Sequence, residues 1–464
     1  MSDRNRYMTV DSVAATLGQD LRRTVRGRVL VRGDEGFDAA RAPWDPAVEQ
    51  NVLAVVEAED AADAAAVTAA ARLAGVGVAA QAYGHAPAAF DGAILLRTGR
   101  MRGVQVDAGA RTARVEAGAS WGDVLQAAGG HGLTGLAGSS PVVSATGFTL
   151  GGGLSWFSRA HGFGADAVRA FEVVDAEGER GRVTADSDPD LFWALRGGGG
   201  DFALVTAMEI DLYPAPSLYG GRLVWPAERA QEVLAAYRSV TAAAPDELSV
   251  WFHLLQFPPF PGVPEPLRGL SAVTVEAVFL GEPEKGRALL REFDAIPGVI
   301  LDTRGPLNVA DLGDVCAEPT EPTPALLRGE LLTALDDAAA TALLASAGPG
   351  TIAPLAYVQL RHLGGALARP TKNAGACGRV TEPYLLGMLG VPATPELAAG
   401  IRERQASIVR ALTPHTSGRK PFTFLGHEEG AAAAFPGDVL ARLREVKRDR
   451  DPMGVFRANH SVLG

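Results

Sequence analysis

The chain has 464 residues, of which 47% are hydrophobic and 21% are charged, so it is long enough for two domains and apolar enough to bury a sizeable core. Its formal net charge of −11 argues against nucleic acid or an anionic membrane as the main partner, because both need a positive surface. Two cysteines cannot supply a disulfide framework. No apolar run is long enough for a signal peptide or a membrane span, so we expect a soluble, cytoplasmic protein.

The first half of the chain alternates predicted strands and helices without a repeating crossover unit. Residues 59–74 predict a helix, because acidic residues occupy its first turn and alanines follow. Asp188 and Pro189 begin another, with aspartate as the N-cap and proline at the first helical position. Residues 101–106 and 112–117 predict a hairpin. The other strands are predicted at residues 75–80, 93–97, 168–174, 181–184 and 202–213.

The pattern changes after a predicted linker at residues 214–217. Strands and long helices alternate there, which predicts an antiparallel sheet covered by helices on one face and an α+β fold class. The chain ends in a predicted amphipathic helix over residues 437–450 and an extended tail over residues 451–459. The strands of this half are predicted at residues 248–256, 272–280 and 355–363, and the helices at residues 227–243, 284–295 and 396–412.

Three glycine-rich loops are the most informative feature of the sequence. Residues 81–87 read QAYGHAP, residues 138–153 read GSSPVVSATGFTLGGG and residues 192–202 read FWALRGGGGDF. Glycine is ordered at a large entropic cost and adds no side chain to a core, whereas consecutive free backbone N–H groups form a nest that can hold a pyrophosphate. None of the loops has the spacing of a Rossmann fingerprint or a Walker A motif. Together they predict a large phosphate-bearing cofactor held by a different fold.

His85 is the strongest candidate nucleophile. It lies between Gly84 and Pro87 in a tight loop after a predicted strand, where an imidazole can face a ligand. A neutral imidazole is a capable nucleophile near physiological pH. The other histidines are scattered and no paired histidine or cysteine spacing occurs, so we expect no metal site.

Ser120 offers a competing interpretation. Residues 118–122 match the G-x-S-x-G pattern of a nucleophile elbow between a strand and a helix, and His427 is available downstream as a base for a serine hydrolase. The same serine has the S-x-x-D spacing of a capping box with Asp123, which predicts a purely structural role at the start of a helix.

The three loops, in this order, resemble those of the vanillyl-alcohol-oxidase type of FAD protein, and specifically the berberine-bridge-enzyme-like oxidoreductases. The resemblance covers nearly all of residues 25–214 and resumes in the C-terminal tail, at residues 451–460. It implies a two-subdomain FAD-binding domain of the PCMH type, built from residues 1–213 and from a C-terminal return at residues 426–464. A substrate-binding domain, residues 214–425, is inserted between these segments.

The resemblance also implies how FAD is held. The histidine of the first loop, here His85, often attaches the flavin covalently, and Ser140 stands where some members have a cysteine that forms a second link, so we expect one covalent bond at most. Val143 stands where access of O₂ to the flavin is controlled, and a valine there resembles the oxidases. The residues implied to contact FAD are Ala82, Tyr83, Gly84, His85, Ala86, Pro87, Ser139, Ser140, Val143, Ala145, Thr146, Gly147, Gly151, Gly152, Gly153, Val205 and Asn459.

Two loops depart from the pattern of this family. Gln81 and Tyr83 stand where many members have arginine and glycine, and Tyr83 is expected to crowd the flavin. Asp201 and Ala203 replace the usual asparagine and glycine after the four glycines.

The implied reaction moves a hydride from a substrate carbon that bears a hydroxyl or amine to the flavin, which O₂ then reoxidises to give hydrogen peroxide. A base must take the substrate proton. A phenol is a usual base in this family, so we expect Tyr384 in that role. Strand alternation places Gln359 and Arg361 on one face, and with His253 they are expected to orient the substrate.

Two alternative functions, from other classes of protein, stay open. One is the serine hydrolase on Ser120, and the other is a flavoprotein that acts as a scaffold or as a cyclase without net redox chemistry. No motif in residues 215–425 identifies the small-molecule substrate, and the oligomeric state is equally open. The alanine-, arginine- and glycine-rich composition favours a bacterial source and a role in secondary metabolism.

Overall fold

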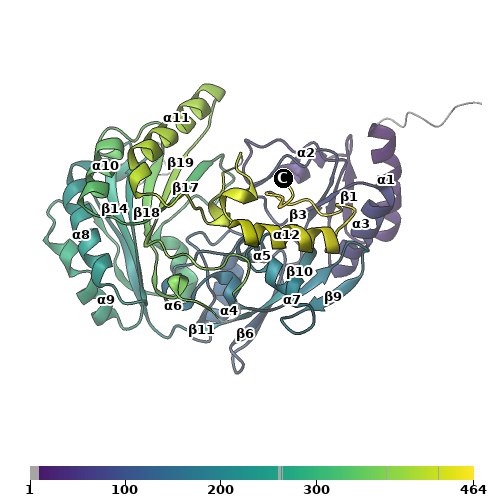
Figure 1. The fold of residues 1–464 in the computed structure, drawn as a ribbon, viewed down its shortest axis with the longest axis horizontal. Helices are drawn as coiled ribbons and strands as arrows, with labels where there is room; N and C mark the ends of the chain where they lie inside the picture. The colour runs from purple at the N-terminus through teal and green to yellow at the C-terminus, as the bar shows by residue number, and fades with distance from the viewer. Residues whose placement is uncertain (1–9, 260–262, 264, 372–373, 427) are drawn as a thin grey trace, which may run out of the picture.

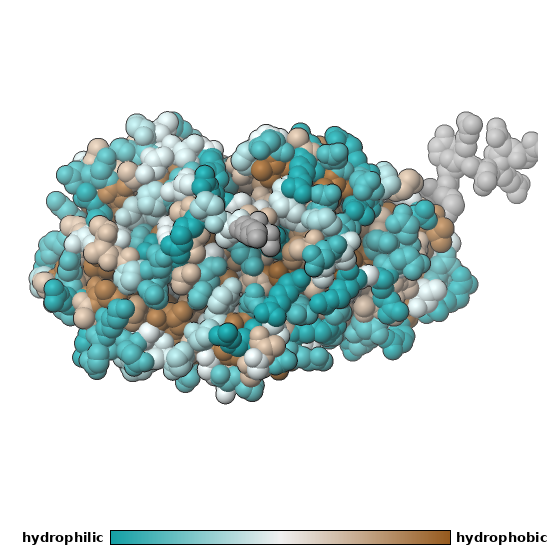
Figure 2. Space-filling model, turned by 60° about the horizontal axis from the view of Figure 1, so that its bottom comes forward, coloured by the Kyte–Doolittle hydropathy of each residue, from teal (hydrophilic) through white to brown (hydrophobic). Residues whose placement is uncertain are grey.

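The computed structural model describes residues 10–464 except 260–262, 264, 372–373 and 427. Figure 1 shows two lobes side by side, one built from the N-terminal part of the chain and one from its middle part, with the C-terminal helix α12 (Gly437–Arg450) lying between them and against the first lobe. The face shown in Figure 2 is largely hydrophilic, with small scattered apolar patches. None of the helices in the described part of the chain is long and apolar enough to cross a membrane.

The first sheet of the N-terminal lobe is mixed. Its strands are ordered β1-β2-β4-β3, with β2, β4 and β3 parallel and β1 antiparallel to β2. Helix α3 packs against this sheet through Ala64, Val67 and Ala71, and its N-cap Asp60 accepts hydrogen bonds from two backbone N–H groups. The elements are α1 (Val10–Thr24), β1 (Arg28–Val31), α2 (Phe37–Arg41), β2 (Ala54–Glu57), α3 (Ala61–Ala74), β3 (Val78–Gln81) and β4 (Ile94–Arg97).

The second sheet of this lobe is antiparallel and ordered β5-β6-β10-β8-β9. The predicted hairpin is present as β5 and β6, and Asp188 caps α7 with proline in its first turn. The elements are β5 (Val104–Asp107), β6 (Thr112–Glu116), α4 (Trp121–Gly129), β7 (Leu133–Thr134), α5 (Ala145–Leu150), α6 (Ser158–His161), β8 (Val168–Val174), β9 (Arg180–Val183), α7 (Pro189–Leu195), β10 (Leu204–Asp211) and β11 (Tyr213–Pro214).

The other lobe is the predicted antiparallel sheet with helices on one face, so the expected α+β fold class is confirmed (Figure 1). Its strand order is β15-β12-β14-β13-β18-β19-β17, and β16 also pairs with β12. The elements are β12 (Leu218–Pro226), α8 (Ala230–Ala243), β13 (Leu248–Gln256), β14 (Ser271–Leu280), α9 (Pro283–Leu289), β15 (Leu301–Asp302), β16 (Gly305–Leu307), β17 (Leu326–Leu332), α10 (Asp337–Ala347), β18 (Tyr357–His362), β19 (Tyr384–Gly390) and α11 (Pro395–Leu412).

The two faces of this large sheet have different partners. Alternate residues such as Phe252, Leu360 and Leu386 pack with residues of α8, α10 and α11 in one apolar cluster. The residues between them, among them Trp251 and Arg361, therefore lie on the face away from those helices. Arg361 borders a cavity of the molecule, so this second face contributes to the wall of that cavity.

The C-terminal tail is fastened to the N-terminal lobe. The N–H of Val78 in β3 donates to the carbonyl of Val455 (2.7 Å), and the carbonyl of Val78 accepts from the N–H of Arg457 (2.8 Å). The buried ammonium of Lys447 in α12 forms ion pairs with Asp201 (3.2 Å) and Asp451 (2.8 Å). Asp201, which departs from the family pattern, is therefore one of the residues that hold the tail in place.

Candidate functional site

A cavity of about 460 Å³ lies where the glycine-rich loops meet the large sheet and the tail. It is lined by residues from all three loops, by residues 422–425 and by residues 456–460. The implied FAD contacts that border it are Ala82, Tyr83, Gly84, His85, Ala86, Ser139, Ser140, Val143, Thr146, Gly147, Gly151, Val205 and Asn459. Four others, Pro87, Ala145, Gly152 and Gly153, do not border it.

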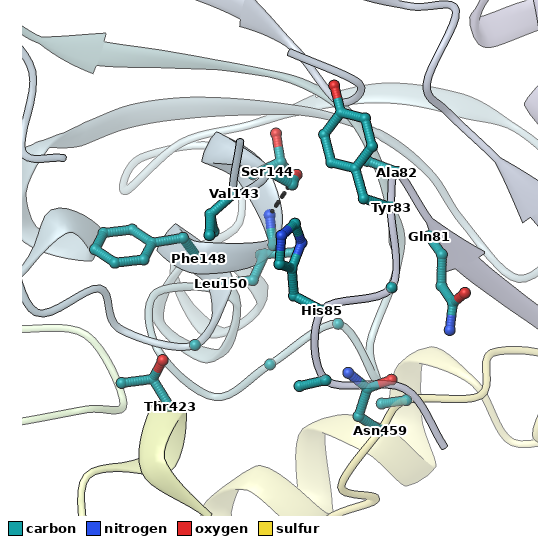
Figure 3. A pocket seen from close by; sticks show the side chains of 18 of the residues that line it. Gln81, Ala82, Tyr83, His85, Val143, Ser144, Phe148, Leu150, Thr423 and Asn459 are labelled. Carbon is teal, nitrogen blue, oxygen red and sulfur yellow. Dashed lines mark hydrogen bonds between the residues drawn. The ribbon is translucent and has the colours of Figure 1, made fainter. Parts of the chain in front are cut away.

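His85 is held at the edge of the cavity with one nitrogen free. Its ring stacks on Trp44, with 4.3 Å between the ring centroids, and Figure 3 shows it on the same loop as Tyr83, with Val143 and Ser144 across from it. Its Nε2 atom is buried and has no hydrogen-bond partner among the described residues. Burial lowers the pKa of His85 to about 4, so the imidazole is neutral at physiological pH. A neutral imidazole with an unused nitrogen is suited to nucleophilic attack.

Tyr83 is anchored rather than loose. Its hydroxyl donates a hydrogen bond to the carbonyl of Gly118 (2.8 Å), which fixes the ring along the cavity wall. A Cβ at Gly118 would lie 2.0 Å from the carbonyl oxygen of Thr98, so only glycine allows this close packing. The other departure in this loop, Gln81, is buried and borders the cavity, and it accepts a hydrogen bond from Arg97 (3.0 Å).

The backbone of the first two loops provides unused donors. Within the described part of the chain, the N–H groups of Tyr83, Gly84 and His85 donate to no other residue, and neither do those of Ser139 and Ser140. Unpaired backbone donors that border a cavity need an acceptor, and the oxygens of a pyrophosphate are suitable ones. These loops therefore fit the predicted dinucleotide.

Glycines of the second and third glycine-rich loops allow other groups to come close to the backbone. Gly199, with φ of +88°, and Gly200 border the cavity, and Gly151 comes close to Thr423. Gly152 and Gly153 have φ values of +102° and +77° and turn the chain after α5 instead of lining the cavity. Some glycines of these segments therefore line the cavity, whereas others allow the chain to turn.

Only two ionisable side chains of the described part of residues 214–425 border the cavity. One is Arg361 on β18, and the other is Glu318, in the loop before β17. Glu318 accepts a hydrogen bond from the hydroxyl of Ser139 (2.7 Å), which places its carboxylate beside the second glycine-rich loop. No sequence pattern indicates Glu318, because it lies in an irregular proline-rich stretch with no periodicity.

Gln359 and His253 do not border the cavity but support Arg361 from behind. The guanidinium Nε of Arg361 donates to Oε1 of Gln359 (2.5 Å), the amide nitrogen of Gln359 contacts Nε2 of His253, and Nδ1 of His253 lies 2.6 Å from the carboxylate of Glu276. Arginine can only donate, so this order fixes the orientation of the Gln359 amide, whose N–H₂ group faces Nε2 of His253, and Nδ1 of His253 faces the carboxylate of Glu276. The predicted cluster of Arg361, Gln359 and His253 is thus one hydrogen-bonded chain.

Tyr384 does not border the cavity. It pairs with His362 in the sheet and belongs to the apolar cluster that the helices cover. Its hydroxyl hydrogen-bonds to the hydroxyl of Thr241 on α8 (2.8 Å), and burial raises its pKa. This position, on the opposite face of the sheet from Arg361, does not suit the predicted role of base, because the phenol cannot reach the cavity.

Ser120 forms the predicted capping box. Its hydroxyl accepts from the N–H of Asp123 (3.2 Å) and donates to the Asp123 carboxylate (2.9 Å), which also accepts from the backbone N–H of Ser120. The side chain is therefore committed to the start of α4. His427, the base of the competing hydrolase hypothesis, lies outside the described residues. Within the described residues no group of histidine, cysteine, aspartate and glutamate side chains has the arrangement of a metal site.

The first and second glycine-rich loops lie in a segment that matches a known family of domains. Residues 52–184 match the family model of an FAD binding domain. The chain is 36% identical over 198 residues to an FAD-dependent monooxygenase of Fusarium proliferatum, a match that covers 41% of this chain and 38% of that protein. It is 30% identical over 206 residues to (R)-6-hydroxynicotine oxidase of Paenarthrobacter nicotinovorans, covering 44% and 45%. The chain therefore spans less than half the length of these curated relatives.

Solved structures extend the likeness to the whole fold. A 6-hydroxy-D-nicotine oxidase from Arthrobacter nicotinovorans superposes with a TM-score of 0.81 at 22% identity, over 94% of this chain and 98% of that one. A berberine-bridge-enzyme-like protein of Physcomitrella patens gives a TM-score of 0.82 at 19% identity, over 96% and 98%. The predicted resemblance and the predicted fold are confirmed.

Proposed function

Because this chain carries the FAD-binding domain and fold of the berberine-bridge-enzyme-like FAD-linked oxidoreductases, we propose that it is an oxidase of a small organic molecule. The bond oxidised is a C–H bond at a carbon that carries a hydroxyl or amine group. FAD, when bound, accepts the hydride from that carbon and delivers the electrons to O₂, which leaves as hydrogen peroxide.

The first and second loops are proposed to hold the cofactor. The unpaired N–H groups of Tyr83, Gly84 and His85, and those of Ser139 and Ser140, supply donors for the pyrophosphate. The neutral, unpartnered imidazole of His85 is proposed to attach the flavin, and Ser140 forms no second link. No thiol of the described residues borders the cavity.

Glu318 replaces Tyr384 as the proposed base. As the substrate loses its hydride and the C=O or C=N bond forms, the Glu318 carboxylate takes the proton of the hydroxyl or amine. The hydrogen bond from Ser139 holds this carboxylate at the cavity wall. Val143 borders the same cavity and is the residue proposed to leave room for O₂.

The observation that carries the proposal is the row of unpaired backbone donors beside an unpartnered buried histidine nitrogen. The test is the absorption spectrum of the purified protein, followed by anaerobic bleaching of its flavin bands with a library of alcohols and amines and by peroxide release in air. A protein that takes up no FAD, even from excess, would refute the proposal. A yellow protein that no substrate bleaches would favour a scaffold or a cyclase without net redox chemistry.

The role of Glu318 is tested with a matched pair of variants. Glu318→Gln is expected to slow flavin reduction about 10²- to 10⁴-fold, the usual contribution of a general base. Glu321→Gln changes an exposed residue of the same loop and serves as the control. Equal rates in the two variants would remove Glu318 from the mechanism.

A further inference from the structure

Among the described residues, the guanidinium of Arg361 at the cavity wall has no ion-pair partner. Its guanidinium lies 3.9 Å from the ring centroid of Trp251 and 5.1 Å from that of Phe424, and its Nε is taken by Gln359. Among the described residues, its two terminal nitrogens donate to no acceptor and form no ion pair. A guanidinium fixed on one side and open on the other presents its two terminal N–H groups as a fork, which matches the geometry of a carboxylate.

The support behind Arg361 is directional. Glu276 is buried and accepts from Arg222 (2.8 Å) and from Thr274 (2.8 Å) as well as from His253. Each donor in the chain from Arg361 through Gln359 and His253 points toward Glu276, so the guanidinium cannot turn without losing its bond to an amide that is itself held in place. Such support holds an arginine in one orientation before a ligand arrives, which lowers the entropic cost of binding.

The opposite charge in the cavity belongs to Glu318. Glu318 accepts a hydrogen bond from Ser139, and among the described residues it forms no ion pair with Arg361, although its charge acts on the guanidinium and favours its charged form. Apolar side chains such as Phe148, Phe424 and Leu327 line the same cavity. The wall therefore offers a cation for one end of a substrate, an anion for another, and an apolar surface for its body.

We propose that the substrate is an organic acid whose carboxylate binds the guanidinium of Arg361, with the reacting hydroxyl or amine directed to Glu318. This inference deepens the proposed function and rests on it. A dianionic phosphate is less suited than a carboxylate, because Glu318 adds negative charge to the same cavity. Gln359 and His253 are positioning residues for Arg361.

The test uses ligands that need no turnover. Benzoate, its neutral analogue benzamide and phenyl phosphate are titrated into the FAD-loaded protein, and binding is followed by calorimetry and by the visible difference spectrum of the flavin. We expect benzoate to bind at least tenfold more tightly than either of the other two. Equal affinity for benzamide would overturn the proposal, and tighter binding of phenyl phosphate would replace carboxylates with phosphate esters.

Variants of Arg361 and Gln359 test whether the guanidinium is the group that binds benzoate. Arg361→Met keeps an apolar stem against Trp251 and removes the charge, and it is expected to weaken benzoate binding at least tenfold while benzamide binding stays within twofold. Arg369→Met removes an exposed arginine that pairs with Asp246 and is the matched control. Gln359→Leu is expected to weaken benzoate severalfold and leave benzamide unchanged, a difference that a general loss of folding would not produce.

Three outcomes separate this inference from the proposed function. If the protein is yellow and is bleached by a substrate, but benzoate binds equally tightly to the wild type and to Arg361→Met, the oxidase proposal stands and the organic-acid proposal fails. If Arg361→Met lowers the flavin's reduction potential while benzoate affinity is unchanged, Arg361 serves the cofactor and the organic-acid proposal likewise fails. A protein that binds benzoate through Arg361 but takes up no FAD would refute the proposed function alone.

Discussion

Tyr384→Phe separates the role expected from the family from the position that the structure gives this residue. The substitution removes one hydroxyl, which hydrogen-bonds to Thr241 on α8 at 2.8 Å. A hydrogen bond of this kind contributes about 0.5–1.5 kcal/mol to stability. The Thr241 hydroxyl also donates to the carbonyl of Arg238 (3.2 Å), so no buried group loses its last partner and the loss is expected at the lower end of that range.

The same variant is expected to keep its rate of flavin reduction within about twofold, because Tyr384 belongs to the helix-covered cluster and does not border the cavity. The assays are urea unfolding followed by tryptophan fluorescence and anaerobic stopped-flow reduction with the best available substrate. Glu318→Gln is measured beside it and is expected to behave in the opposite way, with a large loss of rate and little loss of stability. A hundredfold slower reduction in Tyr384→Phe, with unfolding unchanged, would refute the argument from sheet register.

Three further outcomes follow from other contacts. His85→Ala is expected to release the yellow colour to the supernatant on acid precipitation, whereas colour retained in the pellet would exclude this attachment point. Lys447→Met leaves buried Asp201 and Asp451 without their cation and is expected to lower the free energy of unfolding by about 3–5 kcal/mol, measured in urea. Burial, followed by the charge of Arg159, lowers the pKa of His362 to about 3, so the unfolded chain binds the extra proton between roughly pH 6.5 and pH 3. The free energy of unfolding should therefore decrease as the pH is lowered through that window, by up to about 1.4 kcal/mol per pH unit. His362→Gln should flatten the slope of the urea midpoint plotted against pH.

Local features of this protein were predictable because they depend on neighbours in the sequence. The capping box at Ser120 follows from two residues three positions apart, and the structure has it. The hairpin of β5 and β6 follows from alternation on either side of a short turn. Most of the implied cofactor residues border the cavity because a glycine-rich loop carries its geometry in its own composition.

Tyr384 shows what alternation leaves out. The two-residue period correctly groups Gln359 with Arg361, since both lie within one strand. It cannot relate two strands, because the face that a residue occupies is set by the pairing register. Here His362 stands opposite Tyr384 and Arg361 opposite Leu385, which turns the phenol toward the helices. A shift of one residue would have turned it toward the cavity.

Glu318 shows a second limit, and it explains why the chemistry of the site is harder to predict than its cofactor. Each cofactor loop is recognisable from its own residues, whereas Glu318 meets Ser139 across 179 positions of the chain. Its segment has no helical or strand periodicity, so only the three-dimensional path of the loop brings the carboxylate to the cavity. Arg361 reaches the same cavity from a regular strand, and its unused charge becomes evident only when its neighbours are known. The substrate lobe thus contributes two charges by unrelated routes, and the distance between a substrate's acidic group and its reacting carbon must suit both.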